Sequence, residues 1–318
     1  MQPVFRRELS RAPIRKPPRI RPGDVVGVVA PAGAVDGERL RAGVAVLEGW
    51  GLSVQVGSAV LQRQAYLAGS DEERLADLAQ MIDDPRVRAI FCARGGYGSQ
   101  RLLPRLDLGR LARQPKPIIG YSDATALLGG AVAAGVVAVH GPMVADDMAR
   151  GLSERSATHL RTLLADPGWR WEAEAPITIR PGTASGRLVG GCLAVLAAAL
   201  GTRWAPDTDG AILFLEDVAE RPYRLDRLLT QLRQAGKLER VAGIVFGTMA
   251  ACPPVDGMGP LDVVRACVGD LPCPIAFGLP SGHAASGGVA ENVALPFGVE
   301  VALDAERGRL VALEAAVA

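Results

Sequence analysis

A serine stands where a short apolar run gives way to a helix-like sequence. The segment Lys116–Thr125 reads KPIIGYSDAT, and an Ala/Leu stretch over 124–128 overlaps its end. A strand that turns sharply into a helix exposes the side chain at the turn and directs the next backbone N–H, here that of Asp123, toward an oxyanion. This geometry suits acyl transfer with Ser122 as the nucleophile. In the alternative interpretation, Ser122 or Asp123 only caps the following helix.

A serine nucleophile needs a base within hydrogen-bond reach, and the chain has three histidines. His159 lies in a polar and apolar alternation at helical spacing, which predicts a solvated helix residue. His140 ends an apolar run before Gly-Pro, and either a structural hydrogen bond or a site role fits that position. His283 closes the sequence IAFGLPSGH, a short apolar strand and a turn flanked by small residues. A loop histidine in such surroundings indicates function, so His283 is the favoured base.

The base in turn needs an orienting acid. Residues 210–217 read GAILFLED, an apolar run that ends in Glu216 and Asp217. This is the pattern of a buried parallel strand that delivers an acid to its carboxyl end, the edge at which open α/β sheets bind ligands. Alternatively, the two carboxylates begin the next helix, where its dipole favours negative charge. We expect that alternative to hold for one of the two.

A glycine-rich turn follows another predicted strand. Residues 86–98 read RVRAIFCARGGYG, and such a turn lets backbone N–H groups approach a substrate oxygen closely. Gly96 could therefore supply a second oxyanion donor beside that of Asp123. A phosphate-binding loop is the alternative, but the spacing fits neither the Walker pattern nor the dinucleotide fingerprint.

Taken together, the motifs resemble those of the LD-carboxypeptidases, the muramoyltetrapeptide carboxypeptidases, whose relatives include the microcin C self-immunity peptidases. The resemblance extends from residues 25–33 to the C-terminal hairpin. The motifs that carry it are ARGGYG at 93–98, GYSD at 120–123, HGPM at 140–143, LEDV at 215–218 with RPYRLDR at 221–227, and GLPSGH at 278–283.

The resemblance implies a serine peptidase with a Ser-His-Glu triad. Carried over by motif, Ser122 is the nucleophile, His283 the general base and Glu216 its orienting acid, with the N–H groups of Gly96 and Asp123 as the oxyanion hole. The implied substrate is a murein tetrapeptide, cleaved between the L-centre of a diamino acid and a terminal D-alanine during cell-wall recycling. Two alternatives stay open: a microcin C-type peptidase that cleaves peptidyl or aminoacyl nucleotides, and a non-catalytic peptide-binding relative.

A carboxypeptidase must also bind a free carboxylate with a cation or backbone donors. The arginines near the motifs are Arg94, Arg221 and Arg224, and the substrate-binding candidates are Arg94, Tyr97, Tyr121 and Arg221. The chain departs from the family pattern at Cys192, where relatives usually carry Asn after paired glycines. Cysteine cannot reproduce the donors and acceptor of an amide, which affects expected specificity. Because Cys192 opens an apolar stretch, we expect it to pack as a hydrophobe.

Composition restricts the class of protein. Of 318 residues 49% are hydrophobic and 22% charged, with a net charge of +1, which favours a soluble globular protein without nucleic-acid or membrane partners. Five cysteines without a CxxC pair argue against disulfides and structural zinc, so we expect a reducing, cytoplasmic location. We expect a small peptide substrate (a muropeptide), a homodimer, and no cofactor or metal. A metal-dependent enzyme would instead draw on His140, Asp146 and Asp147.

Apolar strands and amphipathic helices alternate over the first half of the chain, which predicts a parallel sheet. The expected fold class is α/β, with an N-terminal flavodoxin- or Rossmann-like domain and a second mixed α/β domain rich in β-structure. No apolar run of signal-peptide or membrane-spanning length is present. Because Ser122 lies in the first half and Glu216 and His283 in the second, we expect the active site at the domain interface. The expected divisions are a basic Pro-rich leader at 1–23, the nucleophile domain at 24–165, a linker at 166–182 and the C-terminal domain at 183–318.

Overall fold

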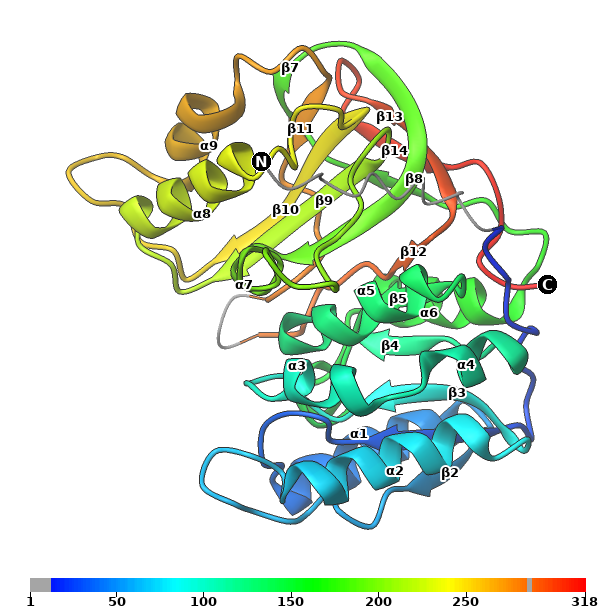
Figure 1. The fold of residues 1–318 in the computed structure, drawn as a ribbon. Coiled ribbons are helices and arrows are strands. Elements are labelled where there is room, and N and C mark those ends of the chain that lie inside the picture. The colour runs from blue at the N-terminus through cyan, green and yellow to red at the C-terminus, as the bar shows by residue number, and fades with distance from the viewer. Residues whose placement is uncertain (1–12, 285–287) are drawn as a thin grey trace, which may run out of the picture.

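The computed structural model describes residues 13–284 and 288–318 and builds them around two β-sheets, one in each half of the view in Figure 1. The N-terminal sheet has six strands in the order β12-β5-β4-β3-β1-β2. Its strands are β1 (Val25–Val29), β2 (Ser53–Val56), β3 (Val87–Cys92), β4 (Ile118–Gly120), β5 (Ala138–His140) and β12 (Leu295–Phe297). The helical segments of this half are α1 (Gly37–Gly49), α2 (Asp71–Asp83), α3 (Ser99–Leu102), η1 (Leu103–Arg105), α4 (Leu108–Arg113), η2 (Ser122–Ala124), α5 (Thr125–Ala133), the π-turn η3 (Val144–Met148) and α6 (Glu154–Ala165).

The strands β1 to β5 of this sheet run parallel, in the order found in flavodoxin-like folds. The apolar residues of β1, β3, β4 and β5 are mostly buried, as expected for strands covered on both faces, whereas the edge strand β2 is partly exposed. The helix α2 begins with a capping box, in which Ser70 and Glu73 bond each other's backbone N–H groups. The carboxyl ends of β1, β3 and β4 therefore meet at one edge, each followed by a loop.

The C-terminal sheet has eight strands in the order β6-β14-β13-β8-β9-β10-β11-β7. Its strands are β6 (Glu172–Glu174), β7 (Ile177–Arg180), β8 (Thr183–Cys192), β9 (Ile212–Val218), β10 (Gly243–Ala250), β11 (Ile275–Phe277), β13 (Glu300–Asp304) and β14 (Arg309–Ala312). The strands β8 to β11 are parallel, and the others pair antiparallel at the two sides. Helices α7 (Leu193–Ala198), α8 (Pro222–Gln234) and α9 (Pro260–Val268) complete this half. The two-sheet α/β class expected from the sequence is confirmed.

Three segments differ from the simple division of the sequence into leader, linker and domains. The predicted linker 166–182 contains β6 and β7, and both pair within the C-terminal sheet. Conversely, β12 belongs to the C-terminal half of the sequence but pairs antiparallel with β5 of the N-terminal sheet. Residues 1–12 of the predicted leader lie outside the described residues, but from residue 13 the chain is docked: the N–H of Arg15 donates to Gly135 O and that of Ile20 to Leu164 O.

The described residues include no helix that combines the length and the apolar character needed to cross a membrane.

Two glycines of α1 offer a matched test of how tightly this half is packed. A methyl group on Gly43 would overlap the carbonyl oxygen of Val144, whereas one on Gly49 would meet nothing within 4 Å. Gly43→Ala should lower the free energy of unfolding by about 1–3 kcal/mol or more, the usual cost of overpacking. Gly49→Ala should raise it by up to about 1 kcal/mol through helix propensity. Urea denaturation of both variants measures the difference, and equal midpoints would contradict the close approach of α1 to η3.

Candidate active site

Ser122 occupies a strained turn directly after β4. Its φ is 59°, a left-handed conformation that a non-glycine residue adopts only when its surroundings enforce it. The side chain is half-buried and faces the glycine-rich turn after β3. A Cβ atom on Gly95 would lie 2.8 Å from the Ser122 Oγ, so only glycine allows the two loops to approach this closely. The turn therefore has the geometry predicted for a nucleophile between a strand and a helix.

The alternative that these residues merely cap the following helix is not what the structure shows. The N-termini of η2 and α5 receive no side-chain cap bond. Asp123 does cap a helix, but a different one: its buried carboxylate accepts the N–H groups of Gly98 (3.3 Å) and Ser99 (2.8 Å), at the start of α3. Asp123 thus binds the glycine-rich loop to the Ser122 turn.

The glycine-rich loop is held on its other side by the loop after β1. The Gly33 N–H donates to Gly95 O at 3.0 Å, and Arg94 Nη1 donates to Ala34 O at 2.9 Å. Across a planar trans peptide, the N–H and C=O point in opposite directions. The Gly96 N–H therefore points away from Gly33. Farther along, Tyr97 is 49% exposed and its ring lies at a centroid distance of 5.9 Å from that of Tyr66.

His283 and Glu216 form a hydrogen-bonded pair. The Glu216 Oε2 accepts both the Nδ1–H of His283 at 2.7 Å and its backbone N–H at 3.1 Å. The Glu216 carboxylate is fully buried. Thr248 Oγ1 holds the His283 loop by donating to His283 O at 2.8 Å. With its proton on Nδ1, the imidazole presents a free electron pair on Nε2, which is the form that a general base requires.

The two groups shift each other's pKa. Burial opposes protonation of His283, but the hydrogen bond and the charge of Glu216 outweigh it, and the pKa of His283 is raised. Burial acts to raise the pKa of Glu216, but the His283 bond and charge outweigh it, so that this pKa is lowered. The pair therefore favours an ionised acid beside an imidazole that readily accepts a proton.

Asp217 has a separate, structural position. Its carboxylate accepts the N–H groups of Ala194 (2.9 Å) and Val218 (2.8 Å), and burial raises its pKa to about 6. The expectation that one of the two carboxylates begins the next helix was wrong, since both lie within β9 and α8 begins only at Pro222; Asp217 instead caps another helix. The helix it caps is α7, which precedes it in the sequence, because β9 extends through both carboxylates and α7 starts beside them.

Tyr121 connects the His283 imidazole with the Ser122 turn. Its ring contacts that of His283 edge-on at a centroid distance of 4.9 Å, and Tyr121 immediately precedes Ser122. Tyr121 is only 1% exposed, and its hydroxyl donates to the buried Asp147 at 3.2 Å. Its observed contacts therefore support the His283 ring. Sequence reasoning missed the contribution of Asp147 to this support.

The carboxylates considered as metal ligands are engaged by arginines. Asp147 pairs with Arg150 at 3.2 Å, and Asp146 pairs with Arg150 and Arg39, each at 3.2 Å. Within the described residues, no group of three or more His, Cys, Asp and Glu side chains is arranged to hold a metal ion.

The other two histidines are buried. His140 is enclosed by the rings of Phe214, Phe297 and Tyr121, and burial lowers its pKa to about 4. The expectation that His159 is solvated was wrong: it is 8% exposed and its Nε2 lies 2.9 Å from Ala294 O. Helix α6 turns the face that carries His159 toward the interior, where the His159 ring contacts those of Trp169 and Trp171.

The remaining candidates lie on the C-terminal half. Arg221 is exposed just before α8, whereas Arg224 is paired with Glu220. Cys192 is 5% exposed, consistent with the expected packing, and its backbone N–H donates to Thr125 Oγ1 at 3.1 Å. Cys192 thus joins the C-terminal sheet to helix α5, which follows the Ser122 turn.

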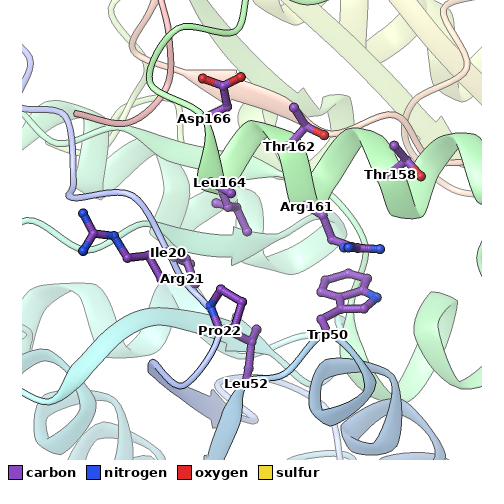
Figure 2. Close-up of a pocket in the computed structure, with 11 residues that line it drawn as sticks. Ile20, Arg21, Pro22, Trp50, Leu52, Thr158, Arg161, Thr162, Leu164 and Asp166 are labelled. Atoms are coloured by element: carbon purple, nitrogen blue, oxygen red, sulfur yellow. The ribbon is translucent and has the colours of Figure 1, made fainter.

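A cavity of about 290 Å³ lies elsewhere, between Ile20–Pro22, the end of α1 and helix α6. Figure 2 shows Trp50, Pro22 and Leu52 on one side and Arg161 and Thr162 of α6 on the other. None of the predicted site residues is among the described residues that line it. This cavity is therefore separate from the predicted site residues.

Comparison with known proteins identifies the family. The N-terminal domain of LD-carboxypeptidases matches residues 26–141, and the C-terminal domain matches residues 185–303. The murein tetrapeptide carboxypeptidase of Pseudomonas aeruginosa is 36% identical, over 89% of this chain and 94% of that protein. The microcin C7 self-immunity protein of Escherichia coli is 27% identical, over 89% and 91%. The crystal structure of muramoyltetrapeptide carboxypeptidase from Oxalobacter formigenes superimposes with a TM-score of 0.82 at 30% identity, covering 90% of this chain and 97% of that one. This chain belongs to the LD-carboxypeptidase family.

Proposed function

We propose that this protein is a serine carboxypeptidase that removes the terminal D-alanine from murein tetrapeptides, at the bond to the L-centre of the diamino acid. The observation that carries the proposal is the His283–Glu216 pair, held by the Tyr121 ring beside the strained turn of Ser122. A buried carboxylate, an imidazole with a free Nε2 and a half-buried serine at a strand-to-helix turn are the parts that serine acyl transfer needs.

In the proposed reaction, Ser122 Oγ attacks the carbonyl carbon of the last peptide bond while His283 Nε2 takes its proton. The oxyanion is stabilised by the N–H groups of Gly96 and Asp123. His283 then gives the proton to the departing D-alanine amine, which leaves an ester on Ser122. Water, deprotonated by His283, hydrolyses this ester and restores the serine. Glu216 stays ionised throughout and stabilises the imidazolium that forms.

The proposed substrate is supported by the names of the relatives and by the arginines near the Ser122 turn. The names of the Pseudomonas and Oxalobacter proteins describe carboxypeptidases of murein or muramoyl tetrapeptides, which favours the same substrate class here. For the terminal carboxylate we propose Arg94, whose bond to Ala34 O places its exposed guanidinium beside the oxyanion loop. Arg224 is a weaker candidate because Glu220 already neutralises it. Tyr97 and Arg221, both exposed, would contact more distant parts of the peptide.

We further propose that the enzyme acts as a homodimer in cytoplasmic cell-wall recycling. All five cysteines are free thiols, as a reducing compartment allows. The second candidate function, cleavage of a peptidyl or aminoacyl nucleotide, is supported by the similarity to the microcin C7 self-immunity protein. Mass spectrometry of the purified protein incubated separately with muropeptides and with an aminoacyl nucleotide distinguishes the two functions, and no cleavage of either would favour a peptide-binding role.

Ser122→Ala should reduce turnover of a murein tetrapeptide by at least about a thousandfold, because it removes the attacking oxygen and leaves the fold intact. Ser53→Ala serves as the control, since this exposed serine lies on the edge strand β2. Released D-alanine is measured for both variants. A Ser122→Ala protein with more than about a hundredth of wild-type turnover would show that the nucleophile is misassigned.

The pH profile of kcat/KM should identify His283. The free enzyme must carry a neutral imidazole, so activity falls as pH drops through the His283 pKa, and this acid limb should lie above the ordinary value of 6.5. Glu216→Gln removes the charge that raises the pKa and should move the limb to lower pH while slowing the reaction. Asp217→Asn, at a carboxylate bonded to Ala194 and not to His283, should move it far less. An acid limb unmoved by Glu216→Gln would leave Glu216 without the orienting role.

Chelation provides an independent check of the mechanism. Since the proposed reaction uses no cation, treatment with EDTA followed by dialysis should leave turnover unchanged within about twofold, well short of what loss of a catalytic metal costs. Recovery of lost activity on adding a divalent metal would contradict the serine mechanism and direct attention to His140, Asp146 and Asp147.

A further inference from the structure

Arg74 is a buried arginine that the proposed reaction does not use. It is the fourth residue of α2, and its side chain has no solvent exposure. Burial of a guanidinium is costly unless its charge and its donors are matched, and a cation near a helix N-terminus opposes the helix dipole. An arginine in this position must therefore be held by specific partners.

The partners of Arg74 are the loops at the carboxyl edge of the N-terminal sheet. Its Nη1 donates to the carbonyl oxygen of Pro31, after β1, and to that of Gly98, after β3, at 3.2 Å in the latter case. Its Nη2 pairs with Asp71, which also pairs with Arg101 at 2.8 Å. One side chain thus ties two catalytic-edge loops to helix α2.

Gly98 is bonded from both sides. Its C=O accepts from Arg74, and its N–H donates to the Asp123 carboxylate at 3.3 Å. A Cβ atom at this position would lie 2.7 Å from Arg74 Nη1, so the guanidinium fills the space that any larger residue would need. Burial lowers the pKa of Arg74, and the carboxylate of Asp71, with a smaller effect from that of Asp123, opposes this shift.

These hydrogen bonds hold both ends of the Gly95–Gly98 turn, in which the Gly96 N–H is one proposed oxyanion donor. The Gly33 N–H holds Gly95 O, and the Arg74–Asp123 clamp holds Gly98, so Gly96 lies between two anchored residues. The second donor is the backbone N–H of Asp123 itself. The clamp therefore sets the position of one donor relative to the other.

We propose that Arg74 is a positioning residue for catalysis, which clamps the Gly95–Gly98 turn against Asp123 so that the two oxyanion donors converge on one point. This inference rests on the proposed function, because it assumes that the Gly96 and Asp123 N–H groups stabilise the oxyanion. It predicts an effect on the reactivity of Ser122 and on kcat, with substrate binding largely retained.

The test compares Arg74→Met and Arg74→Lys with a matched control from the same helix. Asp77 is also a buried charged residue of α2, and its carboxylate holds the loop after β2 through the N–H groups of Ser58 (3.0 Å) and Ala59 (2.8 Å). Asp77→Asn should therefore lower thermal stability without changing the chemistry. Two readouts are taken for each folded variant: the rate at which a fluorophosphonate modifies Ser122, by mass spectrometry, and kcat and KM for a murein tetrapeptide.

Arg74→Met should slow both Ser122 modification and kcat by about tenfold or more, with KM changed by less than about threefold, since a displaced oxyanion donor weakens transition-state binding. Arg74→Lys keeps the charge but lacks the planar fork that bonds both carbonyls through Nη1 and Asp71 through Nη2, so it should fall between Arg74→Met and wild type. If Arg74→Met does not fold, Arg74→Lys decides the question.

Wild-type rates in the folded Arg74 variants, or an equal loss in Asp77→Asn, would overturn the clamp and leave the serine mechanism standing. A wild-type enzyme that is neither modified at Ser122 nor active on the tetrapeptide would overturn the proposed function itself. The two failures are therefore distinguishable.

Discussion

The buried carboxylate of Glu216 is the constraint on which the site depends. An ionised group without solvent is stable only beside matched donors, and both donors to its Oε2 come from His283. The pair is self-consistent, because the imidazole keeps the carboxylate ionised and the carboxylate fixes the tautomer of the imidazole. The strand β9 that delivers Glu216 and the Tyr121 ring beside His283 serve to place this pair.

A second constraint is that the proposed base and the proposed nucleophile come from different sheets. His283 follows β11 of the C-terminal sheet, whereas β12, the next strand along the chain, pairs with β5 of the N-terminal sheet. On this path Asn292 accepts the N–H of Gly282 at 3.0 Å and donates its own N–H to Ser156 Oγ at 3.0 Å. The loop of His283 is thus bonded to the half of the molecule that carries Ser122. Relative motion of the two sheets would strain these bonds.

The local sequence pattern was sufficient to predict the strands that position the proposed catalytic residues. The apolar runs before Ser122 and Glu216 form strands β4 and β9, as expected. The strand β8 was not predicted, because its sequence TASGRLVGGC lacks a regular alternation. It exists through pairing with β9 on one side and β13 on the other, partners that lie distant in sequence. The same limit applies to β12, whose own sequence does not reveal which sheet it joins.

The residues that support the site were harder to find, yet one carries a signal that the sequence does contain. The buried residues of α2 are Arg74, Asp77, Leu78, Met81 and Ile82, a single stripe at helical spacing. Two of these positions hold charges where the pattern requires apolar side chains. Because a charge on a buried stripe must be satisfied by neighbouring groups, each of the two bonds the backbone of a loop beside the sheet. A charged residue that interrupts an apolar stripe therefore indicates a side chain that holds a loop. The sequence alone does not show which loop it holds.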